Sequence, residues 1–255
     1  MFIVNMRLHA ELNDFLPQGK REKVLAVTYT ELPSVKHAIE ALGAPHVEID
    51  AIQANDRWVD FHYQLVDGDQ IQVYPRSSRA LLKNNPILLV PSPPQIIFAL
   101  DSHLGQLATN LRILGFDALY RNDFEDTELA AIAQESQRIL LTRDRRLLMR
   151  SVVKLGYCLR SLDPTQQVQE VVRHFELIAY IHPFQRCLRC NHPLEPVAKE
   201  AVLHRLLPLT RQYFNEFRRC PACDQIYWKG SHYDHMNKLI QQIREIDPSG
   251  EINIG

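Results

Sequence analysis

Two continuous apolar runs that each end in an aspartate constrain the fold of this chain more than any other feature. The first spans residues 96–100 and is followed by Asp101, and the second, Ile139 to Leu141, lies in the segment 138–144, which ends in Asp144. Apolar runs of this length are typical of strands buried on both faces of a parallel sheet. Open α/β sheets bind their ligands beyond the carboxyl ends of such strands. The pattern therefore predicts an α/β domain with an acidic site at one edge of its sheet.

Helical patterns lie between and around these runs. Apolar residues recur at helical spacing from Leu104 to Leu114, and Gly115 is placed to end that helix. Because strands and helices alternate, we expect a parallel sheet with right-handed crossovers. Further strands are predicted over residues 117–121 and 156–160, and further helices over 126–133, 145–153 and 164–175.

Carboxylates at the predicted sheet edge are candidate metal ligands. Asp101 and Asp144 follow strands, and Asp126 opens a helix between them. Converging carboxylates repel one another unless a cation neutralises them, and Mg²⁺ and Mn²⁺ prefer such oxygen ligands. A bound ion can activate a water for attack on phosphorus, so phosphodiester hydrolysis is the predicted reaction. The structural alternatives are a helix N-cap for Asp126, and turn aspartates bonded to nearby amides for the other two.

Arginines close to the same residues are candidates for substrate binding. Arg143 and Arg145 flank Asp144, and Arg112 lies on the helix after Asp101. The planar guanidinium group suits phosphate, which it can bind through two parallel hydrogen bonds. The alternative is that arginines at the start of a helix are simply solvated.

Residues 1–76 are predicted to form a separate ubiquitin-like β-grasp module, joined to the centre by a connector over 77–95. Ser34 is placed to cap a helix that Gly43 ends. Sulfur carriers of this type act through a free C-terminal Gly-Gly, which this segment lacks, so a docking or structural role is favoured. The expected strands span 2–8, 24–29, 47–52, 59–63 and 71–75, the helix spans 35–42, and residues 87–90 are a candidate edge strand.

Four of the five cysteines form two C-x-x-C pairs behind the α/β domain. Two such pairs can complete a tetrahedral Cys₄ zinc site, and the alternative is a redox pair. The segment between the pairs is longer than in compact zinc sites, so we expect a helical insertion around residues 198–217. Cys158 is expected to be a small buried apolar residue. The predicted zinc ligands are Cys187, Cys190, Cys220 and Cys223.

Bases alternate with aromatic residues near the second cysteine pair. This pattern suits stacking on unpaired nucleotides. Arg219 and Lys229 are candidate RNA contacts, whereas packing on the zinc site is favoured for Trp228. The ribbon is predicted to span residues 183–240, followed by a tail over 241–255.

Composition narrows the class of protein. The formal net charge is only −1, so any basic surface must be local. No run approaches the roughly 18 apolar residues of a membrane span, and residues 1–16 lack the apolar core of a signal peptide. A cytoplasmic protein without membrane contact is therefore expected, in which paired cysteines favour zinc over disulfides.

The motifs quoted above together carry a resemblance to a known family. The segments 101–108, 111–117, 126–129 and 141–144 resemble the PIN-like ribonucleases named for the C-terminal domain of the Mut-seven exonuclease. Similar proteins carry a ubiquitin-like segment before the nuclease and a zinc ribbon after it, so the resemblance covers nearly the whole chain. It implies a PIN-like fold over residues 96–182 and metal-dependent RNA cleavage by Asp101, Asp126 and Asp144. A fourth acidic ligand is often present, for which Asp123 and Asp163 are candidates.

Other function classes stay open at this point. A non-catalytic RNA-binding adaptor would keep the fold and the ribbon but lack cleavage, and a protein partner is conceivable for the β-grasp module. A phosphatase of the aspartyl-phosphate type needs a second aspartate two residues after the first, where this chain has His103. We therefore expect a metal-dependent ribonuclease with Mg or Mn at the carboxylates and structural Zn at the cysteines.

Overall fold

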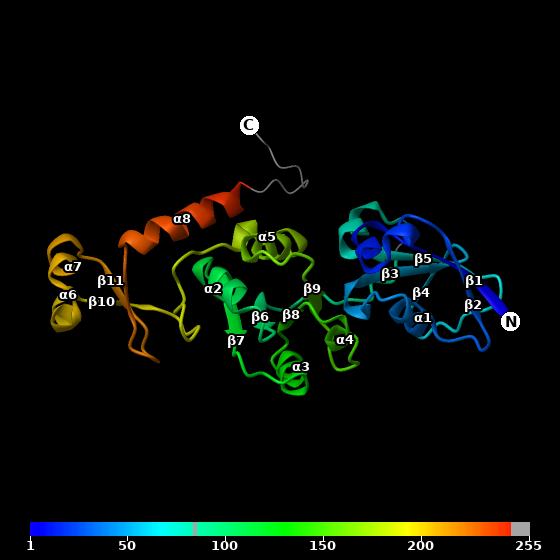
Figure 1. The fold of residues 1–255 in the computed structure, drawn as a ribbon, viewed down its shortest axis with the longest axis horizontal. Helices are drawn as coiled ribbons and strands as arrows, with labels where there is room; N and C mark the ends of the chain where they lie inside the picture. The colour runs from blue at the N-terminus through cyan, green and yellow to red at the C-terminus, as the bar shows by residue number, and fades with distance from the viewer. Residues whose placement is uncertain (84–85, 246–255) are drawn as a thin grey trace. The chain divides into compact units, whose positions relative to one another are not determined.

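The computed structural model describes residues 1–83 and 86–245 of the chain. The chain divides into two compact units, and each combines part of the central α/β region with one flanking module (Figure 1). One unit contains residues 1–95 and 125–160, and the other contains residues 96–124 and 161–255.

The N-terminal module is a five-stranded mixed sheet with the order β2-β1-β5-β3-β4. Its two central strands, β1 and β5, run parallel, while β1–β2, β3–β5 and β3–β4 are antiparallel, as in a β-grasp. The predicted cap forms, since the Ser34 hydroxyl accepts a hydrogen bond from the His37 amide at 3.3 Å. The elements are β1 (Phe2–Leu8), β2 (Leu25–Tyr29), α1 (Val35–Ala41), β3 (Ile49–Ala54), β4 (Arg57–Val59) and β5 (Gln70–Pro75).

Two expectations for this module were wrong in detail. The strand predicted over 59–63 is instead β4, which ends at Val59, because the Asp60 carboxylate accepts the His62 amide at 2.8 Å and fixes a turn. Residues 87–90 form no strand. That segment is held beside β3 by one bond, from the Leu89 amide to the Asp50 carbonyl at 2.8 Å.

The central sheet has four strands in the order β7-β6-β8-β9. The pairs β6–β7 and β8–β9 are parallel, as the alternation of strands and helices predicts. The apolar runs before Asp101 and Asp144 form the buried centre of the sheet, with Phe98 to Leu100 and Ile139 to Leu141 at 0% exposure. The strands are β6 (Ile97–Leu100), β7 (Asp117–Tyr120), β8 (Ile139–Thr142) and β9 (Gly156–Cys158).

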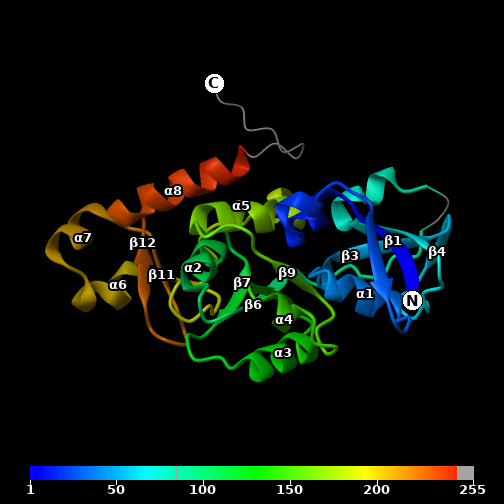
Figure 2. The same ribbon diagram turned by 45° about the vertical axis from the view of Figure 1, so that its right-hand side comes forward.

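Helices flank this sheet, which gives the expected α/β PIN-like architecture. In one unit α2 packs on α5 and on β7 (Figure 2), and in the other α3 and α4 contact β8. The helix predicted over 145–153 is a single turn, followed by a tight turn closed by the Val153 amide on the Arg150 carbonyl. The helices are α2 (Gly105–Ile113), α3 (Asp126–Glu135), α4 (Arg145–Leu148) and α5 (Pro164–His174).

The C-terminal module is a three-stranded antiparallel sheet with the order β10-β11-β12. The predicted helical insertion is confirmed, because two short helices lie between β10 and β11, and Val202 and Leu206 pack on Phe217 and Ile226. The module comprises β10 (Glu195–Val197), α6 (Lys199–Val202), α7 (Pro208–Tyr213), β11 (Phe217–Arg219), β12 (Ile226–Trp228) and α8 (Ser231–Arg244).

The final helix corrects the predicted tail. α8 continues to Arg244, so residues 241–244 are helical rather than frayed, and Ile243 is fully buried. The rest of that predicted tail, residues 246–255, lies outside the described residues. Within residues 1–83 and 86–245, no helix has both the length and the apolar character needed to span a membrane.

A buried ion pair joins the β-grasp module to β9 in the same unit. The Glu48 side chain is 3% exposed, and its carboxylate accepts the Cys158 amide at 2.6 Å and two Arg160 nitrogens at 3.0 and 2.6 Å. Burial raises the pKa of Glu48, although Arg160 and the Cys158 amide oppose that shift. Nearby, His46 bonds to the Val153 carbonyl at 3.0 Å. The module is thus fixed to the central region by buried polar contacts.

We expect Arg160→Met to destabilise the protein by about 3–5 kcal/mol, because it leaves the Glu48 carboxylate buried without its counter-charge. Urea denaturation measures this loss. The matched control is Arg21→Met. Arg21 is exposed, pairs with the exposed Asp14 at 3.6 Å and donates to the Leu16 carbonyl at 3.1 Å, so its replacement should cost about 1 kcal/mol or less. Adding Glu48→Gln to Arg160→Met should recover part of the loss. Equal effects of the two arginine variants would contradict a stabilising buried pair.

Candidate functional site

Asp144 lies where the sequence places it, just beyond the carboxyl end of β8. Its carboxylate Oδ1 accepts the Arg146 amide at 2.7 Å and so caps α4, while its own amide donates to the Thr142 hydroxyl at 2.9 Å. Thr142 is fully buried, so this contact anchors the turn to the sheet. The side chain of Asp144 is exposed. The capping bond uses one carboxylate oxygen, Oδ1.

Asp101 and Asp126 occupy different surroundings. Asp101 follows β6 and is half-buried, its Oδ1 accepts the Ser102 hydroxyl at 3.2 Å, and its carbonyl accepts the Leu104 amide at 2.9 Å. Asp126 is exposed and is the first residue of α3, whose N-cap is Glu125, so Asp126 is not the cap. Asp101 lies in one compact unit, and Asp126 and Asp144 lie in the other.

Asp163 and Asp123, the two candidates for a fourth acidic ligand, both make local hydrogen bonds. Asp163 is the N-cap of α5, where its Oδ1 accepts the Thr165 and Gln166 amides, both at 2.9 Å. Asp123 is exposed and pairs with Arg121 at 2.9 Å, a hydrogen bond that lowers the pKa of the Asp123 carboxyl. Each carboxylate therefore has a structural partner already.

Arg143 and Arg145 line a cavity of about 400 Å³ together with residues of the β-grasp module. Both are exposed, and Arg145 donates to the Phe15 carbonyl at 3.1 Å while its guanidinium lies over the Phe15 ring. Four of the lining residues are arginines and one is an acid. The cavity is lined by Asp14, Phe15, Arg21, Arg143, Arg145, Cys158, Leu159 and Arg160. Cys158 is 4% exposed, as expected of a buried apolar residue.

Arg112, by contrast, is a buried structural side chain. It is 4% exposed, and its guanidinium donates to the Ala118 carbonyl at 3.0 and 2.8 Å and to the Leu188 carbonyl at 2.9 Å. Asn191 completes this junction, since its amide group accepts from the Ala118 amide at 3.1 Å and donates to Asp117 at 2.8 Å. The contacts of Arg112 and Asn191 hold the first cysteine pair against β7.

The four predicted cysteine ligands converge. Their sulfur atoms all lie within 4.8 Å of one another, and the shortest separations join Cys187 to Cys223 at 3.5 Å and Cys190 to Cys220 at 3.4 Å. Zinc–sulfur bonds of about 2.3 Å in a tetrahedron place sulfurs about 3.8 Å apart. The cluster therefore has the donor set and the spacing to hold a metal ion such as zinc. Among the described residues it is the one such cluster of histidine, cysteine and acidic side chains.

The two cysteine loops share one backbone geometry. The backbone carbonyls of Cys187 and Cys220 accept hydrogen bonds from the amides of Asn191 and Asp224, both at 2.9 Å. Asn191 and Asp224 have left-handed φ values of 69° and 60°. Such φ values are tolerated by Asn and Asp better than by most residues. This repeat gives each loop the knuckle shape that aims two sulfurs at one point.

Tyr227 reaches the first knuckle from β12. Its hydroxyl lies 3.2 Å from the Cys187 sulfur and accepts the Leu188 amide at 3.0 Å. Burial opposes ionisation of Cys187, but hydrogen bonds from Tyr227 and from the amides of Cys190 and Arg189 outweigh it and lower the pKa of this thiol to about 6. Burial raises the pKa of Cys190 to about 12. The site thus favours a thiolate at Cys187 before any ion is bound.

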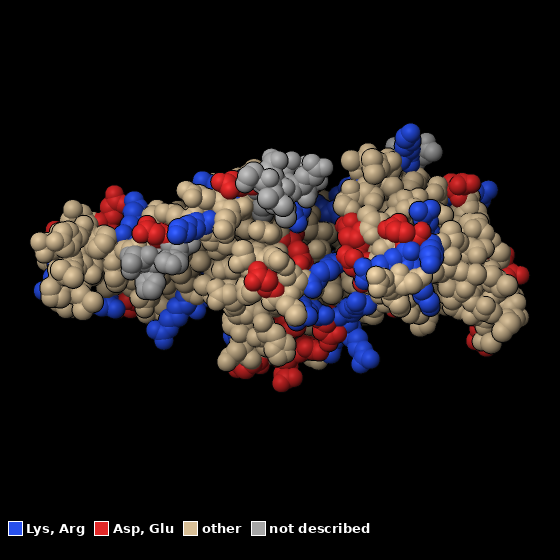
Figure 3. Space-filling view, turned by 45° about the horizontal axis from the view of Figure 1, so that its top comes forward, with Lys and Arg blue, Asp and Glu red and all other residues tan. Residues whose placement is uncertain are grey.

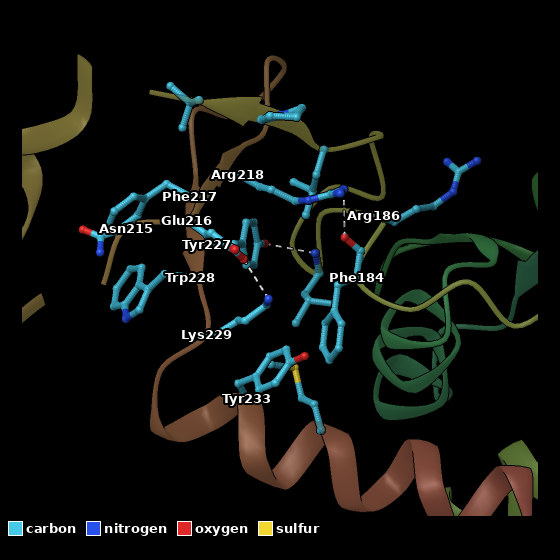
Figure 4. Close-up of a pocket in the computed structure, with 15 residues that line it drawn as sticks. Phe184, Arg186, Asn215, Glu216, Phe217, Arg218, Tyr227, Trp228, Lys229 and Tyr233 are labelled. Atoms are coloured by element: carbon cyan, nitrogen blue, oxygen red, sulfur yellow. Dashed lines mark hydrogen bonds and ion pairs between the residues drawn. The ribbon is translucent and has the colours of Figure 1, made fainter. Parts of the chain in front are cut away.

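A second cavity, of about 390 Å³, opens beside the knuckles (Figure 4). Figure 4 shows Phe184, Tyr227, Lys229 and Tyr233 directed into the same space between the strands and α8. Lys229 pairs with Glu216 at 2.7 Å, a hydrogen bond that raises the pKa of Lys229. Lys229 therefore lines a cavity, and its contact with substrate stays a prediction.

Arg219 lies elsewhere. It pairs with Asp224 at 3.6 Å and is not among the residues that line this cavity, whereas Arg218 is. Adjacent residues of a strand point to opposite faces, so the period of β11 separates the two arginines. Sequence reasoning noted Arg218 among the bases near the second cysteine pair but preferred Arg219, and it did not single out Phe184 or Tyr233. The strand period would have distinguished Arg218 from Arg219, but no local signal marks Phe184 or Tyr233.

Charge is otherwise mixed over the surface. Figure 3 shows lysine and arginine interspersed with acidic residues on the face that it presents, in keeping with the net charge of −1.

Comparisons with known proteins match two family models to the chain. The model described as the Mut7-C RNAse domain matches residues 96–240, and the model described as Mut7-C ubiquitin matches residues 1–80. Neither the comparison with curated proteins nor that with solved structures found a match. The RNAse model covers both the central sheet and the cysteine knuckles.

We expect the purified protein to hold about one metal ion per chain at the Cys₄ site, and Cys220→Ser to lose most of it, because one missing thiolate opens the tetrahedron. Inductively coupled plasma mass spectrometry measures the metal content per chain and identifies the ion. Cys158→Ala is the control and should keep the full content, since Cys158 lies outside the cluster. A wild-type protein purified without metal, and unable to take up added zinc, would argue against the site.

Proposed function

Because the chain belongs to the Mut7-C RNAse domain family, as the match over residues 96–240 shows, we propose that it is a metal-dependent ribonuclease. Its reaction would be hydrolysis of RNA phosphodiester bonds at a carboxylate-bound Mg²⁺ or Mn²⁺. Asp101, Asp126 and Asp144 would hold the ion, and the Cys₄ cluster would hold structural zinc.

The sheet order is the observation that carries this proposal. β6 and β8 are consecutive in the order of the four-stranded sheet, and Asp101 lies one residue and Asp144 two residues beyond the carboxyl ends of these strands. Parallel strands that are neighbours in a sheet end at the same edge, where α/β folds bind ligands. In the unit that contains Asp144, the Arg150 guanidinium donates to the Thr127 hydroxyl at 2.9 Å. This bond ties the start of α3, where Asp126 lies, to the segment after α4.

The chemistry follows from the residue types at this edge. A divalent ion held by carboxylates lowers the pKa of a bound water and stabilises charge on the phosphoryl oxygens. Asp144 can serve as a ligand through Oδ2 while Oδ1 keeps the bond to the Arg146 amide that fixes its orientation. Thr142, bonded to the Asp144 amide, holds the turn in place. Preorganised ligands of this kind need no rearrangement when the substrate arrives.

Substrate contacts are proposed at the basic cavities. Arg143 and Arg145 would bind RNA phosphates next to Asp144, in the cavity that Arg21 and Arg160 also line. Lys229 would contact RNA at the ribbon, and Arg219 is retained as an exposed candidate there. Phosphate contacts fix the position of the RNA, and bases would be read elsewhere.

Cleavage of labelled single-stranded and structured RNAs tests the proposal. We expect cleavage with Mn²⁺ or Mg²⁺, none when these ions are left out, and a loss of at least about 100-fold in Asp101→Asn and Asp144→Asn, because a neutral amide binds the ion more weakly. Asn also serves as an N-cap, so Asp144→Asn should stay folded.

Asp56→Asn is the matched control for these variants. Asp56 sits in an exposed turn with a φ of 65°, which Asn tolerates, so its activity should equal that of the wild type. Cleavage that is equal in all variants would mean a contaminating nuclease and would sink the assignment. RNA binding without cleavage would favour the non-catalytic adaptor instead.

A second prediction concerns the phosphate contacts. Arg143→Ala should weaken RNA binding in Asp144→Asn protein by about 1 kcal/mol, roughly fivefold, and lower the slope of log affinity against log salt by about one. Fluorescence anisotropy over a salt series measures both quantities. Arg138→Ala, in which an arginine outside this cavity is removed, should change neither. A variant of Arg143 with unchanged salt slope would exclude a phosphate contact.

A further inference from the structure

The cavity beside the knuckles has features of a binding site rather than of a packing gap. Its volume of about 390 Å³ falls within the range of small-ligand sites, which starts at roughly 300 Å³. It is lined from β10, β11, β12, the first knuckle and the start of α8. The floor is apolar and aromatic, with Leu188, Tyr227 and Met236 among its residues.

Phe184 and Tyr233 form an aromatic wall of this cavity. Phe184 and Tyr233 stack with ring centres 4.7 Å apart and an interplanar angle of 30°. Trp228 is 38% exposed although it is a large aromatic residue, and Figure 4 shows it beside Phe217, on the other side of β12 from Tyr227. Partly exposed rings that face a cavity offer stacking surfaces to a flat ligand.

Cations surround the aromatic wall. Arg186, Arg218 and Lys229 line the cavity, against a single acidic residue, Glu216. Arg218 donates to the Phe184 carbonyl at 3.4 Å and to the Gln185 side chain at 3.1 Å, neither of which is charged. Arg186 pairs with Asp117 at 3.3 Å and Lys229 pairs with Glu216 at 2.7 Å, so the excess of positive charge at the rim rests on Arg218, beside an apolar interior. A ligand that is flat and apolar in one part and anionic in the next complements this surface.

We propose that this cavity binds an unpaired base of single-stranded RNA, with the neighbouring phosphates on Arg218 and Lys229. The inference rests on the proposed nuclease function and names its substrate class, single-stranded rather than duplex RNA. Bases buried inside a duplex cannot reach such a cavity, whereas unstacked bases can stack on aromatic side chains. This stacking is tolerant of sequence because every base has a π-face.

The metal cluster supports the wall of this site. The Tyr227 ring lines the cavity while its hydroxyl contacts the Cys187 sulfur at 3.2 Å and the Leu188 amide at 3.0 Å. A bound ion would fix Cys187 and, through it, the orientation of Tyr227. The knuckles thus position an RNA-binding wall besides stabilising the ribbon.

Binding of a labelled single-stranded RNA of about twelve nucleotides to Asp144→Asn protein tests the proposal without cleavage. Fluorescence anisotropy is measured for this oligomer, for the same oligomer with abasic positions and for the matching duplex. We expect Trp228→Ala and Tyr233→Ala, each added to that variant, to weaken binding of the normal oligomer about tenfold, and to leave binding of the abasic oligomer unchanged. The parent variant should bind the duplex and the abasic oligomer more weakly than the normal one.

Tyr213→Ala is the matched control, because Tyr213 is a 67% exposed aromatic residue of α7 outside the cavity. Metal content and circular dichroism confirm that each variant is folded. Equal affinities of Trp228→Ala, Tyr233→Ala and Tyr213→Ala for the normal oligomer would overturn the proposal, as would equal losses on abasic RNA. If the wild type cleaves RNA but these affinities are equal, the nuclease proposal stands and the base-binding proposal fails. If binding depends on the bases but the wild type does not cleave, the base-binding proposal stands and the nuclease proposal fails.

Discussion

The buried carboxylate of Glu48 is the constraint on which one half of this molecule depends. A carboxylate with 3% exposure costs several kcal/mol unless donors replace its water. Those donors, the Cys158 amide and the Arg160 guanidinium, belong to β9 and the residues after it. The β-grasp module therefore satisfies Glu48 against that strand. Its residues Phe15 and Arg21 consequently line the cavity that Arg143 and Arg145 also line, so the module helps to shape a surface next to Asp144.

The second unit follows the same principle with a different device. Here the first knuckle is held against β7 by Arg112 and Asn191, whose side chains bond to the backbone of both segments or to Asp117. Each flanking module is therefore built into one part of the central α/β region and is not an appendage on a linker. A protein organised in this way positions its accessory surfaces with the stiffness of a packed core.

Sequence reasoning succeeded where the signal is local and failed where the partners are distant. The apolar runs before Asp101 and Asp144, the Ser34 cap and the four cysteines each carry their signal within a few residues, and the structure has the strands, the cap and the thiol cluster in those places. In the sequence, Arg112 cannot be distinguished from an arginine that binds phosphate. In the structure its partners are the carbonyls of Ala118 and Leu188. Likewise, Phe184 and Tyr233 meet only through the fold. The convergence of the three aspartates on one ion stays a prediction.

The contacts at Ala118 affect how the edge of the central sheet is shielded from other chains. β7 is an edge strand of the central sheet, and such edges offer open peptide groups to other chains. At Ala118 the amide is taken by Asn191 and the carbonyl by Arg112, so side chains of the knuckle region and of α2 close the edge. A knuckle without its metal would hold Asn191 less firmly, while Arg112 of α2 would still bond the Ala118 carbonyl. Metal binding at the knuckle would thereby help to shield this sheet edge from other chains.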